Sequence, residues 1–97
     1  MSIFGKIYFT DHSEERYITR IGVRKNMTVE ESLQRDLYYK RVRKIVDTAD
    51  TKHVFTLGCR EFIFVKKANK LIFKTAIKHT KKSYEYKHAK LMREKNR

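Results

Sequence analysis

The stretch from residue 60 to residue 79, REFIFVKKANKLIFKTAIKH, decides how the chain folds. Two runs rich in aromatic and β-branched residues lie on either side of the pair Ala68-Asn69, which predicts two strands joined by a tight turn. A third run of the same kind, HVFTL, precedes them at residues 53–57. Because the connections are so short, the three strands are expected to form an antiparallel meander.

Two helices are expected ahead of this meander. Residues 2–9 first alternate as a short strand, and a helix that begins at Thr10 or the next residue then runs to Gly22. A second helix opens at Thr28, where TVEE has the form of a capping box. Its apolar stripe predicts that this helix continues to about Val46.

The end of the chain, residues 80–97, is strongly basic and has Tyr84, His88 and Leu91 at helical spacing. It is expected to form either a docked basic helix or a partly frayed tail, and the spacing favours the helix. The complete order is therefore β-α-α-β-β-β-α. It predicts a single α+β domain over residues 1–97, with helices packed on one face of an antiparallel sheet.

The charge of the chain points to a polyanionic partner. The formal net charge is +13 and the sequence pI is about 10.0. Residues 51–97 carry 14 Lys and Arg against 3 Asp and Glu, whereas residues 1–50 carry 10 against 8. Because counterion release favours binding of nucleic acids to basic surfaces, RNA or the ribosome is the expected partner, and an anionic lipid surface is the weaker alternative.

Cysteine content and hydropathy bear on the location of the protein. The single cysteine, Cys59, cannot form an internal disulfide, which fits a reducing compartment. The N-terminus does not resemble a signal peptide, and no apolar run approaches the roughly 20 residues that a membrane helix needs. We expect a cytoplasmic protein without a membrane partner.

One face of the first predicted helix carries a possible site. His12, Arg16 and Arg20 follow one another at four-residue intervals, which stacks them on one side of a helix. A neutral imidazole in the first turn could accept a proton, and the two guanidinium groups could hold a phosphate. The alternative is an ordinary solvated helix face with weak surface ion pairs.

The predicted sheet offers further basic and aromatic candidates. Arg60 opens the most apolar strand, either facing the same pocket as His12 or simply holding its head in water. Period-two alternation places Lys74 and Lys78 in one row on the sheet. Tyr84 and Tyr86 could stack on bases, although one of them is expected to anchor the last helix. The candidate nucleic-acid-binding residues are Arg20, Lys74, Lys78, His79, Lys81, Lys82 and Tyr84.

Several other chemistries lack their sequence patterns. The chain has no glycine-rich phosphate loop, no nucleophile elbow, no carboxylate cluster for magnesium and no zinc-type spacing of cysteine and histidine. We therefore expect neither a metal nor a cofactor. Cleavage of RNA remains chemically possible without them, since the 2′-hydroxyl supplies the nucleophile and the protein only has to move protons and stabilise charge.

Two segments resemble a known group of proteins. The predicted order of elements, with Gly58-x-Arg60 entering an apolar strand and KTAIKHTKKSYEY closing the meander, looks like RelE-type toxins, which are small RNases. The opening FTDHSEER resembles phage and plasmid domains with His-x-x-x-Arg on a helix. Both groups belong to the barnase, EndoU, colicin and RelE superfamily of metal-independent RNases. The resemblance implies catalytic roles for His12, Arg16 and Arg60, and weaker ones for Lys74, His79 and Tyr84.

These observations lead to two hypotheses of different kinds. The first is an RNA-binding, toxin-like endoribonuclease in which Arg16 and Arg60 grip the scissile phosphate, His12 moves a proton and Lys74 supports the charge. The second is a non-catalytic small phage or plasmid protein that binds nucleic acid or an acidic host protein. Either could have an antitoxin or another acidic protein as partner, and could exist as a monomer or as a weak dimer formed through a sheet edge.

Overall fold

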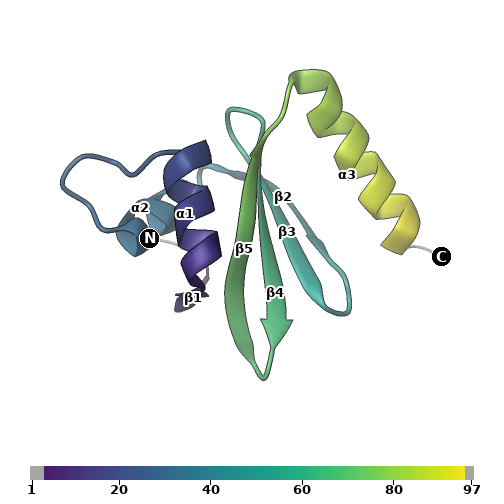
Figure 1. Ribbon diagram of the computed structural model, residues 1–97. Coiled ribbons are helices and arrows are strands. Elements are labelled where there is room, and N and C mark those ends of the chain that lie inside the picture. The colour runs from purple at the N-terminus through teal and green to yellow at the C-terminus, as the bar shows by residue number, and fades with distance from the viewer. Residues whose placement is uncertain (1–3, 96–97) are drawn as a thin grey trace.

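Five strands and three helices make up the described part of the chain, residues 4–95, in a computed structural model (Figure 1). The radius of gyration is 12.9 Å, close to the value of about 13 Å expected for a compact domain of this length. No helix in this part is both long and apolar enough to cross a membrane. The elements are β1 (Ile7–Phe9), α1 (Asp11–Arg20), α2 (Val29–Asp36), β2 (Val42–Asp47), β3 (Thr51–Thr56), β4 (Arg60–Lys67), β5 (Lys70–Lys78) and α3 (Lys81–Lys95).

The strands form one sheet in the order β1-β5-β4-β3-β2. Strands β2 to β5 follow one another as an antiparallel meander, and β1 pairs in parallel with β5. The turn between β4 and β5 uses positive φ angles at Ala68 (51°) and Asn69 (62°), as a tight hairpin requires. The predicted α+β class is therefore confirmed, but the sheet is mixed because the short N-terminal strand joins it in parallel.

The second predicted helix is much shorter than expected. It begins at Thr28 with the predicted capping box, in which the Thr28 and Glu31 side chains each bond the other residue's backbone N–H, but it ends at Asp36. Residues Val42–Asp47 form β2, so the prediction of a helix up to Val46 was wrong. The apolar residues of this segment have helix-compatible spacing, but they are β-branched, and pairing with β3 gives their backbone groups partners.

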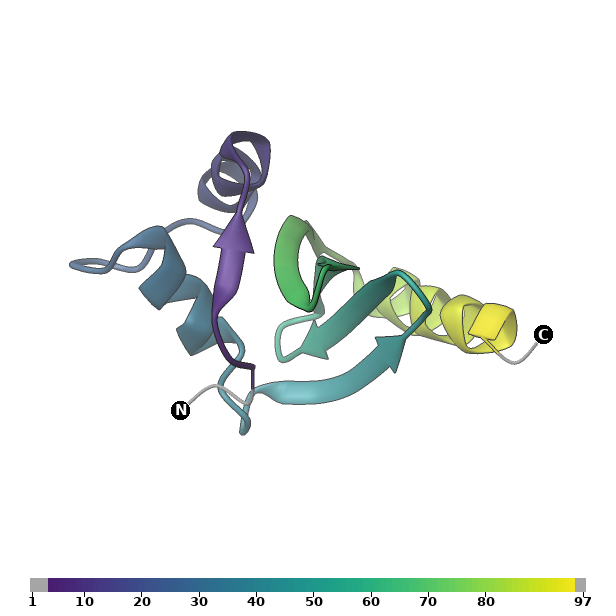
Figure 2. The same cartoon turned by 90° about the horizontal axis from the view of Figure 1, so that it is seen from below.

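Helices cover both faces of the sheet, not one. Helices α1 and α2 pack on the face that holds the main core, to which they contribute Tyr17 and Leu33, and Leu37 joins this core directly after α2. Helix α3 packs on the opposite face, where Leu91 meets Phe55, and Figures 1 and 2 show it on the other side of the sheet from α1 and α2. The strand residues of the main core are Ile7, Val54, Phe62, Phe64, Phe73 and Ala76.

A β-bulge in β5 changes the faces that simple alternation predicted. Thr75 lies opposite Ile63 and Phe73 lies opposite Phe64, so Lys74 is an extra residue without a place in the ladder. As a result Phe73 and Ala76 are buried in the same core. Strict period-two alternation, which puts Phe73 and Ala76 on opposite faces, therefore fails in this strand, while Lys74 and Lys78 are both exposed.

A buried polar network joins α1 to α2. The side chain of Tyr17 is fully buried, and its hydroxyl group hydrogen-bonds to Ser32 Oγ (2.8 Å) and to Asp36 Oδ2. Arg24 Nη2 donates to Asp36 Oδ1 (2.8 Å), and its backbone N–H donates to Ser32 Oγ (3.0 Å). Burial, together with the bond to the Asp36 carboxylate, raises the pKa of Tyr17, so this hydroxyl stays protonated as a donor.

Replacing Tyr17 by phenylalanine should lower the free energy of unfolding by about 1–3 kcal/mol, because the ring keeps its packing while the buried Asp36 loses a donor. Urea unfolding followed by circular dichroism measures the difference. The control is Tyr86→Phe, since Tyr86 is 64% exposed, and this change should shift the free energy by less than about 0.5 kcal/mol. Equal effects of the two changes would contradict a stabilising role for the network.

Candidate nucleic-acid interface

The polar face predicted for the first helix exists on α1. His12, Arg16 and Arg20 are all exposed and line one shallow hollow of about 220 Å³, together with Glu15 and Thr19. Arg20 has a structural contact as well: its Nη1 donates to Thr75 Oγ1 (2.8 Å) and to the Ala76 carbonyl (3.3 Å). The structure thus keeps His12, Arg16 and Arg20 together and ties α1 to β5 through the last of them.

Arg60 lies at a different place. It lines another hollow together with Ile21 and Gly22, just beyond the last turn of α1, whereas His12 lies in the first turn. A helix rises about 1.5 Å per residue, so His12 and Ile21 are separated by about 13 Å along the axis. His12 and Arg60 therefore line different hollows near opposite ends of α1, and the structure does not bring them to a common groove.

The basic and aromatic candidates near α3 divide into exposed and packed residues. Tyr84 anchors the helix, because its ring lies 5.2 Å from that of Phe55 between centroids and its hydroxyl donates to the Thr56 carbonyl (3.0 Å). Tyr86 is 64% exposed. The interpretation that one of the two tyrosines anchors the last helix is therefore confirmed. The exposed cations among these candidates are Lys74, Lys78, Lys81 and Lys82.

His79 belongs to a buried cluster around Glu61. The Glu61 carboxylate is fully buried under α3 and bonds His53 Nδ1 (2.7 Å) and His79 Nε2 (2.7 Å). Lys87 Nζ approaches from α3 at 3.2 Å, and His79 Nδ1 lies 3.1 Å from Ser83 Oγ. Both ring nitrogens of His79 are thus used inside the protein, which leaves this side chain to hold α3 on the sheet.

The pKa of Glu61 reflects this surrounding. Burial raises the pKa of the carboxyl group, but the hydrogen bonds from His53 and His79 and the charge of Lys87 outweigh burial, so the pKa lies below its ordinary value. The carboxylate is therefore ionised at neutral pH. Among residues 4–95, no three His, Cys, Asp or Glu side chains are placed to hold a metal ion.

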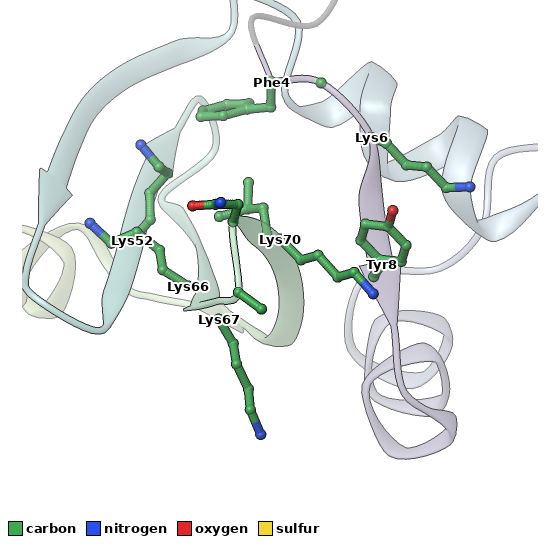
Figure 3. A pocket seen from close by; sticks show the side chains of 11 residues that line it. Phe4, Lys6, Tyr8, Lys52, Lys66, Lys67 and Lys70 are labelled. Carbon is green, nitrogen blue, oxygen red and sulfur yellow. The ribbon is translucent and has the colours of Figure 1, made fainter.

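A second kind of site lies at the far end of the sheet, between the N-terminal segment and the turn after β4. It is a hollow of about 770 Å³ whose wall carries five lysines and two aromatic rings (Figure 3). We call it the lysine hollow. Its charged and aromatic residues are Lys6, Lys52, Lys66, Lys67, Lys70, Phe4 and Tyr8.

The rings and cations of the lysine hollow are in contact. Lys6 Nζ and Lys70 Nζ lie 5.3 Å and 5.1 Å from the centroid of the Tyr8 ring, which is 37% exposed. Lys52 and Lys66 both approach Asp47 Oδ1 at 3.1 Å, so one carboxylate partly neutralises two of the five cations. The arrangement combines surplus positive charge with an accessible aromatic surface, and it can bind a phosphate beside a flat ring.

Neither the lysine hollow nor the Glu61 cluster was predicted from the sequence. The run KKANK at residues 66–70 could have indicated the lysine hollow, because it places three lysines around a turn in the more basic half of the chain. Phe4 and Tyr8 reach that turn only through the parallel pairing of β1 with β5. Glu61 could also have been noticed, because it is the one carboxylate of its strand and directly precedes the apolar run FIFV, where a buried charge needs partners.

Replacing Glu61 by glutamine should lower the free energy of unfolding at pH 7 by about 3 kcal/mol, since two histidines and Lys87 lose their carboxylate. The folded pKa lies below the value of 4.5 expected without these contacts, so the ion pairs stabilise the fold above that pH. Their contribution is lost as the pH falls through the lowered pKa. Urea unfolding at pH 7 and pH 3 should therefore show a difference from the parent protein that shrinks in acid.

The exposed Glu85 on α3, the helix that carries Lys87, supplies the matched control, and Glu85→Gln should have little effect at either pH. A Glu61→Gln difference of the same size at pH 7 and pH 3 would contradict the electrostatic account of this cluster.

No protein family, no curated protein and no solved structure matches the chain. What the chain does is therefore inferred from its own residues.

Proposed function

We propose that this protein is a cytoplasmic RNA-binding protein whose lysine hollow binds single-stranded RNA. The observation that carries the proposal is the accessible Tyr8 ring, which has two ammonium groups within 5.3 Å of its centroid and lies in a hollow with three further lysines. The lysines would contact phosphates, and the ring would stack on a base. Both contacts tolerate any base sequence, because every nucleotide has a phosphate and a flat face.

Charge supports this assignment. Asp47 is the one carboxylate that forms an ion pair with these lysines within residues 4–95, so most of their charge is not neutralised by the protein. Like charges held together destabilise a folded chain, and an RNA backbone relieves that repulsion when its own counterions are released. Four of the five lysines come from the strongly basic half of the chain.

Shape and chemistry favour a single strand over a duplex. A hollow of about 770 Å³ falls in the range of about 300–1,000 Å³ that is typical of small-molecule sites, so it has room for one nucleotide with its base splayed out. Bases in a duplex are stacked on each other and cannot reach Tyr8, whereas unpaired bases can. The sequence resemblance to small RNases favours RNA over DNA.

Removing two charges from the lysine hollow should weaken RNA binding and change its salt dependence. Lys67 and Lys70 are both exposed, so the double change Lys67→Gln and Lys70→Gln should leave the fold intact. Each phosphate contact on a single strand contributes about 0.7 to the slope of log K against log salt, so the slope should fall by about 1.4. Fluorescence anisotropy with a labelled single-stranded RNA at several salt concentrations measures it.

The matched control removes two exposed lysines elsewhere, by Lys25→Gln and Lys40→Gln. If this control lowers affinity and slope as much as the change in the lysine hollow does, the binding is spread over the whole surface and the hollow is not the site.

A second candidate function is metal-independent cleavage of RNA at the hollow on α1. The observation that favours it is the exposed His12 in one hollow with Arg16 and Arg20. His12 would accept the proton of the 2′-hydroxyl group, and the two arginines would stabilise charge on the phosphate. Arg60 has no part in this site, because it lies beyond the opposite end of α1.

Cleavage by this route should survive EDTA and depend on His12. Gel analysis of a mixed RNA pool is expected to show at least about a hundredfold slower cutting by His12→Ala than by the parent protein, with Lys25→Ala unchanged. Intact RNA with the parent protein would remove the cleavage hypothesis and leave RNA binding. Undiminished cutting by His12→Ala would remove this site.

A further inference from the structure

Four arginines gather at the end of the sheet opposite the lysine hollow. Arg60 begins β4 and Lys67 ends it, and a strand rises about 3.3 Å per residue, so the two ends are about 23 Å apart. Two hollows lie at the arginine end, of about 600 Å³ and 290 Å³, and they share Arg24 and Arg41. We call the four residues that line them the arginine cluster: Arg24, Arg35, Arg41 and Arg60.

The protein itself neutralises little of this charge. Within residues 4–95 the single ion pair of the cluster joins Arg24 Nη2 to Asp36 Oδ1 at 2.8 Å. Asp36 is only 2% exposed, and its other oxygen already bonds the Tyr17 hydroxyl group. Three of the four guanidinium groups thus have no carboxylate partner in this part of the chain, and repulsion among them disfavours the arrangement unless an anion is present.

Two donors in the cluster also lack partners. The Nε atoms of Arg24 and Arg41 are buried, and neither finds a hydrogen-bond acceptor in the described part of the chain. A buried donor without an acceptor costs about 1–3 kcal/mol, so such groups in a stable protein call for an explanation. A guanidinium group offers its Nε and Nη hydrogens as a planar pair, which matches two oxygens of one phosphate.

The amount of charge indicates the class of ligand. Four guanidinium groups against one carboxylate leave an excess that a phosphodiester, with one negative charge, does not balance. A terminal phosphate carries about two charges at neutral pH, and a pyrophosphate group carries more. The Tyr38 ring lines the larger hollow beside Arg35 and offers a surface for a base.

From these observations we propose that the arginine cluster binds the terminal phosphate or pyrophosphate group of a nucleotide. This site is separate from the lysine hollow and does not depend on RNA binding there. The same group could come from a free nucleoside diphosphate or from the 5′ end of an RNA, since both present the same charge and oxygen geometry.

Isothermal titration calorimetry with inorganic pyrophosphate tests the site directly. We expect binding to the parent protein, at least tenfold weaker binding to Arg41→Gln and to Arg60→Gln, and unchanged binding to Arg93→Gln, which removes an exposed arginine on α3. The Lys67→Gln, Lys70→Gln protein should bind pyrophosphate as the parent does, which separates this site from the lysine hollow.

Arg60→Lys keeps the charge but loses the paired hydrogen bonds, and it should also bind several-fold more weakly. If Arg41→Gln does not fold, the Arg60→Lys variant still tests whether the cluster binds pyrophosphate. Absence of pyrophosphate binding by the parent protein, or an equal loss in Arg93→Gln and Arg60→Gln, would overturn the proposal.

Three ligands distinguish a free nucleotide from an RNA end as the source of the phosphate group. Their affinities for the parent protein are compared: adenosine diphosphate, a short RNA with a 5′-diphosphate, and the same RNA with a 5′-hydroxyl group. A free nucleotide that binds as tightly as the 5′-diphosphate RNA identifies a nucleotide site. Tighter binding of the 5′-diphosphate RNA identifies an RNA-end site. Equal binding of the 5′-diphosphate and 5′-hydroxyl RNAs, together with no binding of adenosine diphosphate, would contradict recognition of a terminal phosphate.

Discussion

The parallel pairing of β1 with β5 is the contact on which the rest of the arrangement depends. Only three residue pairs form it, from Ile7 with Leu71 to Phe9 with Phe73, but they join the first strand of the chain to the last. The pairing fixes where α1 starts, so that α1 lies along β5 and covers the main core. It also carries Tyr8 to the turn after β4, where the ring meets Lys70. Without it, neither the core nor the lysine hollow would be complete.

Short-range sequence features correctly predicted those helices and strands that depend on neighbouring residues alone. The strands of the 60–79 stretch and the starts of both N-terminal helices follow from turn residues, β-branched runs and caps, and each was predicted at nearly its observed position. Two features escaped because pairing across the sheet decides them. The apolar residues of Val42–Asp47 satisfy a helical stripe and a strand equally well, and only β3 as a partner selects the strand. The bulge at Lys74 is one extra residue, which reverses the faces after it.

For the candidate sites, the composition of the chain predicted the positive charge but not the places where it concentrates. Composition predicted a cationic surface and a polyanionic partner, since net charge needs no knowledge of the fold. The places where charge concentrates depend on contacts between distant segments: the lysine hollow combines residues 4–8 with residues 66–71, and the arginine cluster draws on residues that lie between 24 and 60. The face of α1 was predicted correctly because one helix contains all of it, whereas its proposed connection to Arg60 required a tertiary distance.

The chain has few acidic residues. Those that form ion pairs hold some of the many cationic side chains in fixed positions. Within residues 4–95 the ion pairs use three carboxylates: Asp36, Asp47 and Glu61. Asp36 lies behind the arginine cluster and Asp47 beside the lysine hollow, and each fixes some of the cations while leaving most of their charge uncompensated. Glu61 instead holds α3 on the sheet. Because a fixed cation loses less conformational entropy on binding than a mobile one, Asp36 and Asp47 would lower the entropic cost of the anion binding that we propose for these two surfaces.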